Sequence, residues 1–171
     1  GCVNSQKTHL MYALGDGCEY RVIAFSSEEK AKRAYEEYRF LTEDVYLYPA
    51  RDLLFYYADI KGKVLTGRRM EVLRALIEKE PGKSLTVITT MDAFLDGLSG
   101  PEEIGKRRIS LKSGEEMDFS EFQSRLSAIG YEREEQIEGP GQFAVRGGIL
   151  DVFPLTEELP VRIELWGDEI D

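Results

Sequence analysis

The sequence has few of the residues that metal centres and imidazole chemistry need. Its 171 residues include two cysteines, Cys2 and Cys18, and one histidine, His9. Two cysteines without a histidine cluster form neither a disulfide scaffold nor a zinc site, and they fit the reducing cytosol. A lone histidine excludes any mechanism that needs two imidazoles. We therefore expect a cytoplasmic protein with no metal site.

Long apolar runs are also missing from the sequence. None approaches the roughly 20 residues that cross a bilayer, so we expect no transmembrane segment, no signal peptide and no membrane partner. The 42% of hydrophobic residues is still sufficient for a folded core.

The charge is distributed unevenly along the chain. The formal net charge is −10, and residues 1–108 carry 17 basic and 17 acidic side chains, whereas residues 109–171 carry 5 and 15. This division predicts two domains, 1–108 and 109–171. Duplex DNA binding relies on cations that displace counterions from phosphate, so the acidic domain is not expected to hold DNA by itself. A protein partner is the better expectation.

The first two thirds alternate between β-branched runs and helical patterns. Ser26, with Glu29 three residues later, has the pattern of a helix N-cap. Buried strands are expected at 21–25, 45–48 and 85–89, and helices directly after the first strand and at about 67–78. The second helix is expected to bury Met70, Leu73, Leu76 and Ile77. This order predicts an α/β unit with a parallel sheet and helices on both faces.

From about residue 109 the pattern changes to one helix followed by strands. Asp118 has the chemistry of an N-cap, and Gly130 is the type of residue that follows a helix. Strands are expected at 142–146, 149–153 and 161–166. They predict a small α+β domain with an antiparallel sheet, joined to the first domain near residues 98–104.

The start of the chain matches the phosphate-binding pattern G-x-x-x-x-G-K-[ST] except at its second glycine. Gly1, Lys7 and Thr8 fit, but Gln6 occupies the glycine position. A residue without a side chain is needed there, so that backbone N–H groups can close around phosphates. We expect the loop to be inactive, with Lys7 and Thr8 opening an ordinary helix and no ATP or magnesium bound.

Alternation in the last long strand predicts an exposed face. If Val161, Ile163 and Leu165 face the core, then Arg162, Glu164 and Trp166 project together to the other side. The same logic leaves Arg146 outward. An exposed tryptophan beside arginines is typical of a binding anchor. The alternative is a cross-strand pair of Arg146 with Glu164, with Trp166 covered by a neighbouring segment. This set contains no acid/base pair or activated nucleophile, so no catalytic residue is expected.

Two basic clusters offer a further possibility. Lys106-Arg107-Arg108 and Arg68-Arg69 have the composition of a nucleic-acid contact, but a solvated helix end or linker is the favoured interpretation.

Several longer motifs together resemble the amino-terminal module of the bacterial transcription-repair coupling factors. The most specific are Tyr131–Arg133, Pro140–Pro154 and Pro160–Asp171, and the upstream matches are Ser5–Lys7, Tyr48–Asp52, Arg69–Leu73 and Val87–Ala93. The resemblance covers essentially the whole chain. It implies a degenerate RecA-like α/β unit, similar to that of UvrB, followed by a UvrA-binding domain.

The resemblance also implies which residues contact UvrA, namely Arg146, Arg162, Glu164 and Trp166. UvrB has an additional arginine where this chain has Ala144, and it has a long aromatic hairpin where this chain has a short segment after Tyr57. The implied role is a non-catalytic adaptor fragment that helps recruit excision repair to stalled RNA polymerase. ATP, magnesium, RNA polymerase and DNA would be bound by other parts of a longer, ATP-driven translocase.

Two other functions remain open from the residues. One is a UvrB-like, nucleotide-dependent DNA-binding fragment that works through Lys7 and Thr8. The other is a regulatory clamp, in which another domain of the same protein covers the predicted face until it is needed.

Overall fold

The computed structural model of the chain describes residues 4–51, 59–96, 101–106 and 108–171. The chain divides into two compact units. The first comprises residues 1–57 and 68–98, and the second comprises residues 58–67 and 99–171. Each unit is described separately below.

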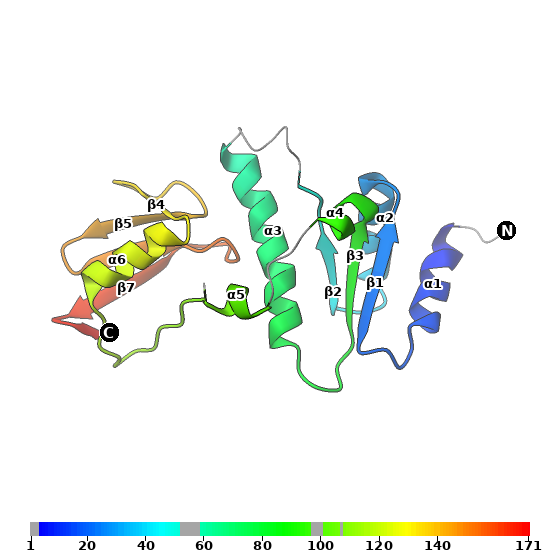
Figure 1. Ribbon diagram of the computed structural model, residues 1–171, viewed down its shortest axis with the longest axis horizontal. Coiled ribbons are helices and arrows are strands. Elements are labelled where there is room, and N and C mark those ends of the chain that lie inside the picture. Colours follow the sequence, from blue (N-terminus) through cyan, green and yellow to red (C-terminus); the bar gives the residue numbers. More distant parts are fainter. Residues whose placement is uncertain (1–3, 52–58, 97–100, 107) are drawn as a thin grey trace. The chain divides into compact units, whose positions relative to one another are not determined.

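The first unit contains a parallel three-stranded sheet (Figure 1). Its strands are β1 (Tyr20–Phe25), β2 (Val45–Tyr48) and β3 (Leu85–Thr90), in the order β1-β3-β2. The register places Val87 of β3 beside Val22 of β1 and Tyr46 of β2. Since β3 lies in the centre, all six of its residues are buried. The three predicted strands are thus confirmed.

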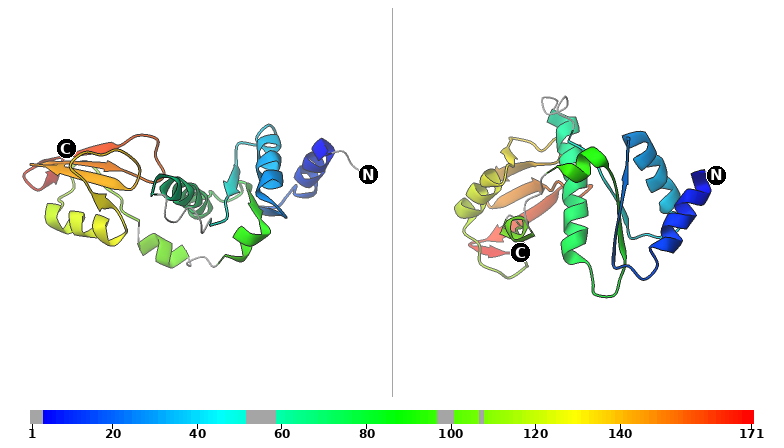
Figure 2. Two further views of the ribbon diagram at one scale, coloured as in Figure 1. Left: turned by 90° about the horizontal axis from the view of Figure 1, so that it is seen from above. Right: turned by 45° about the vertical axis from the view of Figure 1, so that its right-hand side comes forward.

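Helices cover both faces of this sheet, as predicted (Figure 2). The helices in or partly in this unit are α1 (Asn4–Leu14), α2 (Glu28–Tyr38), α3 (Asp59–Glu78) and α4 (Met91–Leu95). On one face, Ala31, Ala34 and Tyr38 of α2 pack in a core with Ile88. On the other face, a second core joins Val87 with Val72 of α3 and Ala93 of α4.

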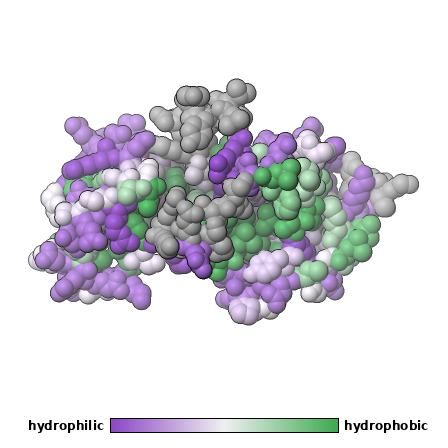
Figure 3. Space-filling model, in the orientation of Figure 1, coloured by the Kyte–Doolittle hydropathy of each residue, from purple (hydrophilic) through white to green (hydrophobic). Residues whose placement is uncertain are grey.

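The exposure of β1 differs from the prediction of a buried strand. Tyr20 and Val22 are exposed, because β1 is an edge strand and the second core does not extend over them. Exposed apolar residues of α4, Met91 and Phe94, add to this surface. Hydrophobic surface accordingly gathers around α4 and β1 in Figure 3.

Two helix predictions also need correction. The N-cap of α2 is Ser27, whose hydroxyl accepts from the Lys30 amide, whereas the Ser26 hydroxyl accepts from the Lys30 ammonium group. Helix α3 begins at Asp59 rather than near residue 67, and it buries Val72 while Ile77 is exposed. Apolar residues occur on both sides of this helix, so their spacing alone did not decide its orientation.

The second unit combines helices with a five-stranded sheet. The helices are α5 (Pro101–Lys106) and α6 (Phe119–Ala128), and the strands are β4 (Glu132–Arg133), β5 (Gln142–Arg146), β6 (Ile149–Phe153), β7 (Val161–Trp166) and β8 (Glu169–Ile170). They follow one another in chain order across the sheet. All pairs are antiparallel except that of β4 with β5, which is parallel. The predicted α+β organisation is confirmed, with two short strands added.

Helix α6 packs against one face of this sheet (Figure 2). Asp118 is its N-cap, as predicted, and accepts from the amides of Ser120 and Glu121. The core between helix and sheet consists of Met117, Phe122, Leu126, Phe143, Leu150, Val152, Ile163 and Ile170. Since side chains alternate along a strand, the sheet residues between these core positions project from the opposite face.

Candidate partner-binding face

The face of the second sheet that lies opposite α6 brings together the predicted surface residues. We call this surface the outer face and define it by Arg146 on β5, Ile149 and Asp151 on β6, and Arg162, Glu164 and Trp166 on β7. The strand registers align Arg146, Ile149 and Glu164 in one row across the sheet, and Ala144, Asp151 and Arg162 in the next row.

Trp166 is a highly exposed hydrophobic side chain of the outer face. It is 79% exposed, whereas Ile163 on the same strand is buried and Leu165 is half-buried. The predicted alternation is therefore confirmed from Arg162 to Trp166. It is wrong for Val161, which is 47% exposed at the beginning of the strand. A tryptophan that the core does not use leaves a large apolar surface in water.

Arg162 is held by a residue that the sequence analysis missed. Its Nε and Nη2 atoms donate to the two carboxylate oxygens of Asp151, at 2.7 and 2.9 Å. The pair is formed between register neighbours of β6 and β7. Arg162 lowers the pKa of Asp151 below its ordinary value, chiefly through this hydrogen bonding, so the carboxylate stays ionised near neutral pH. Asp151 alternates with buried Leu150 and Val152, which was a usable signal that it faces outward.

Arg146 is exposed and is oriented by the main chain. Its Nη2 atom donates to the carbonyl oxygen of Glu135 at 2.9 Å. Strand β6 lies between β5 and β7, so Arg146 and Glu164 are not neighbours across strands. The alternative interpretation was a cross-strand pair of Arg146 with Glu164 and a Trp166 covered by a neighbouring segment. It is wrong, because the two residues are not on adjacent strands and Trp166 is 79% exposed.

The outer face offers side chains that can form contacts with a partner. It places one exposed aromatic ring and two guanidinium groups on one sheet face, with Glu164 between Arg162 and Trp166 along β7 and Asp151 paired with Arg162. Aromatic rings and guanidinium groups gain most when a partner removes water from them. The described residues contain no group of three or more histidine, cysteine, aspartate or glutamate side chains placed to hold a metal ion.

The predicted degenerate nucleotide loop is only partly within the described residues. Gly1 lies outside them, and Gln6 and Lys7 are exposed on α1. Thr8 is buried, and its hydroxyl donates to the Glu37 carboxylate of α2. This hydrogen bond is the main cause of the lowered pKa of Glu37. The hydroxyl that reaches magnesium in an intact phosphate loop is here engaged in helix packing.

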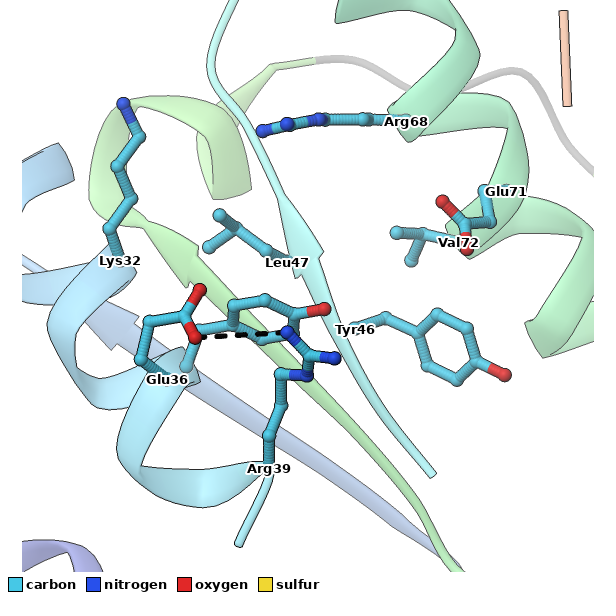
Figure 4. A pocket seen from close by; sticks show the side chains of 9 residues that line it. Lys32, Glu36, Arg39, Tyr46, Leu47, Arg68, Glu71 and Val72 are labelled. Carbon is cyan, nitrogen blue, oxygen red and sulfur yellow. Dashed lines mark ion pairs between the residues drawn. The ribbon is translucent and has the colours of Figure 1, made fainter. Parts of the chain in front are cut away.

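A cavity of about 330 Å³ lies between α2, β2 and α3 in the first unit (Figure 4). Lys32 of α2, Arg39 at the C-cap of α2 and Arg68 of α3 contribute cations to its lining, with Leu47 of β2 between the helices. Arg39 forms an ion pair with Glu36 at 3.7 Å, and Lys32 contacts Glu28 at 3.5 Å. None of Gln6, Lys7 and Thr8 lines this cavity, so it is not the predicted nucleotide site.

The basic pair Arg68 and Arg69 does not form an exposed basic surface. Arg68 is exposed, but Arg69 is buried with its guanidinium group 4.3 Å from the centre of the Tyr48 ring. Its Nη1 atom donates to the carbonyl oxygen of Pro49 and to Asp96, each at 3.0 Å. Arg69 therefore stabilises the first unit and is not available to nucleic acid. In the other cluster, Arg107 lies outside the described residues.

Within the part of the chain that the structure describes, no helix combines the length and the apolar composition needed to cross a membrane.

Comparison with known proteins relates this geometry to a family. The family model of the UvrB interaction domain matches residues 109–171, which include the whole outer face. The transcription-repair-coupling factor of Bacillus subtilis (strain 168) is 32% identical over 145 residues, which are 83% of this chain and 12% of that protein. The factor of Staphylococcus haemolyticus (strain JCSC1435) is 34% identical over 129 residues, 75% of this chain and 11% of that protein. The chain spans 11–12% of the length of these relatives. Because the similarity extends over 75–83% of the chain, the chain belongs to the transcription-repair-coupling factor family.

Proposed function

We propose that this chain is a non-catalytic adaptor that binds UvrA through the outer face of its second unit. The observation that carries the proposal is the 79% exposure of Trp166 on the same sheet face as Arg162, opposite the core of a UvrB interaction domain. Arg146 and Glu164 complete the proposed contact. The resemblance of these positions to the family's UvrA contact supports UvrA as the partner.

The physical basis is that of a small set of anchor residues. A tryptophan that is desolvated by a partner contributes a large apolar area, and a guanidinium group adds several directed hydrogen bonds. Such residues dominate the binding energy of protein interfaces, while their neighbours exclude water. The mixture of both charge signs on the outer face favours a protein surface over a phosphate backbone as its partner.

We further propose that UvrA binding helps recruit nucleotide excision repair to RNA polymerase stalled at DNA damage. The names of the relatives, transcription-repair-coupling factors, support this role. ATP-driven translocation, and contact with RNA polymerase and DNA, belong in this proposal to parts of a longer protein outside these residues.

The proposal is tested by replacing both anchors. In the double variant Arg162→Ala with Trp166→Ala, the affinity for UvrA measured by calorimetry should fall at least about tenfold, because truncation of an anchor costs about 1–4 kcal/mol. Phe40→Ala is the matched control, since Phe40 is an aromatic residue of the first unit that is 90% exposed. UvrA binding that is undiminished in the double variant, with its fold shown intact by circular dichroism, would refute the proposal.

The exposure of Trp166 also favours one related function, a regulatory clamp in which another domain of the longer protein covers the outer face. In that case this chain should bind UvrA more tightly than the intact protein does, and equal affinities would exclude the clamp. No comparable observation favours the nucleotide-dependent alternative, because Thr8 is engaged with Glu37.

A further inference from the structure

We infer that Asp151 is a positioning residue for UvrA binding, which fixes the Arg162 guanidinium group in the orientation that the partner requires. This inference rests on the proposed function and adds a residue and a mechanism to it. It starts from the two hydrogen bonds, 2.7 and 2.9 Å long, that join the two side chains on the outer face.

The surroundings of Asp151 make Arg162 its dedicated partner. In the row that crosses the sheet, Asp151 lies between Ala144 and Arg162. Ala144 has only a methyl group and offers no hydrogen bond. Arg146 acts on the carboxylate electrostatically and, like Arg162, favours its ionised form. The carboxylate therefore stays charged and remains directed to Arg162.

Asp151 is less exposed than Arg162, as expected if Asp151 positions the side chain and Arg162 contacts the partner. The Asp151 side chain is 21% exposed, whereas that of Arg162 is 58% exposed. Asp151 binds the Nε and Nη2 atoms of Arg162, so Nη1 takes no part in the pair. The guanidinium group thus keeps N–H donors that a partner can bind, while Asp151 fixes its orientation.

Stability of the fold does not account for this pair. Exposed ion pairs contribute little to the free energy of folding, because solvent screens them and the side chains lose freedom. In binding, the same loss of freedom is favourable, since an arginine that is already ordered loses less entropy when the partner arrives. We therefore expect Asp151 to affect UvrA affinity more than it affects unfolding.

The test is a double-mutant cycle on UvrA affinity, measured by calorimetry with the 171-residue chain. Asp151→Asn should weaken binding about three- to tenfold, the range expected when one flexible side chain must be ordered on binding. In an Arg162→Ala background, Asp151→Asn should have no further effect, because its action passes through Arg162. Asp168→Asn, in the exposed turn between β7 and β8, removes the same charge and should leave affinity unchanged.

A second measurement does not depend on UvrA. In spectra of chain labelled with nitrogen-15 arginine, the Nε proton of Arg162 should exchange with water more slowly in the wild type than in Asp151→Asn. Equal exchange rates would overturn the inference, because they would mean that the pair does not restrain the guanidinium group in solution.

The outcomes separate this inference from the proposed function. If Arg162→Ala and Trp166→Ala weaken UvrA binding but Asp151→Asn binds as tightly as wild type or more tightly, only the positioning role fails. An undiminished effect of Asp151→Asn in the Arg162→Ala background would also overturn that role. If neither Arg162→Ala nor Trp166→Ala weakens binding, both the proposed function and the inference fail.

Discussion

Two arginines of this chain show how the surroundings of a guanidinium group decide its use. Arg162 lies on the outer face, with its side chain 58% exposed and its orientation fixed by Asp151. Arg69 has a comparable carboxylate partner, Asp96, but its own side chain is only 9% exposed. The first arrangement leaves donors accessible to a partner. The second encloses the charge and makes its partner important for stability.

Asp96→Ala should therefore destabilise the first unit. The change leaves the buried Arg69 guanidinium group with the Pro49 carbonyl and the Tyr48 ring but without its counter-charge. We expect a loss of about 1–3 kcal/mol in the free energy of unfolding, less than for a fully buried pair because Asp96 is partly exposed.

Urea unfolding followed by circular dichroism measures this loss. Asp16→Asn, an exposed position after α1, is the control and should leave the midpoint unchanged. A midpoint of Asp96→Ala equal to that of the wild type would show that the buried ion pair does not stabilise the unit.

At the residue scale, the sequence predicted which side of the sheet a side chain faces better than it predicted which residue that side chain pairs with. Period-two alternation placed Arg162, Glu164 and Trp166 outward, because alternation is local to one strand. The partner of Arg162 depends on the register between β6 and β7, which are joined by residues 154–160, and no local pattern sets that register. The burial of Arg69 could not be predicted either, because its hydrogen-bond partners lie 20 and 27 positions away in the sequence.

At the scale of elements, local chemistry again decided what could be predicted. The N-cap at Asp118 was predictable because a short polar side chain satisfies the first amides of the following helix. The cap of α2 was displaced by one residue because Ser26 and Ser27 are both capable of the role. The strands β4 and β8 have two residues each, too few for any periodic pattern, and depend on pairing with longer neighbours.

The cap at Asp118 should make the stability of the second unit depend on pH. The amides of Glu121 and Ser120 and the Ser120 hydroxyl donate to the carboxylate and lower its pKa below the ordinary value. A carboxyl whose pKa is lower in the folded state adds stability above its unfolded pKa, and this contribution is lost as the pH falls through the folded value.

Asp118→Asn keeps a capping oxygen but cannot ionise. The melting temperature of the wild type should exceed that of Asp118→Asn at neutral pH, and the difference should shrink below about pH 4. Thermal unfolding at a series of pH values measures this difference. A difference that stays constant over the whole range would show that the charge of Asp118 does not stabilise the cap.

At the scale of the whole chain, the uneven charge distribution supports a prediction about the partner, whereas composition did not predict the exposure of individual strands. The entire net charge of −10 lies in residues 109–171, which contain the outer face, and this made a protein partner the natural expectation. In contrast, the three strands of the first unit looked equally apolar. Only the structure shows that β1 is an edge strand over which the second core does not extend, which leaves Tyr20 and Val22 exposed.

The central claim is that the outer face is the surface on which UvrA docks. It is tested most directly by placing the photo-crosslinking residue p-benzoylphenylalanine at position 166 or, as a control, at position 40, and irradiating each chain with UvrA. Both positions carry highly exposed aromatic side chains, but only Trp166 belongs to the outer face. The account predicts a covalent adduct with UvrA from position 166 and none from position 40. Adducts of equal yield from both positions, or an adduct from position 40 alone, would contradict it.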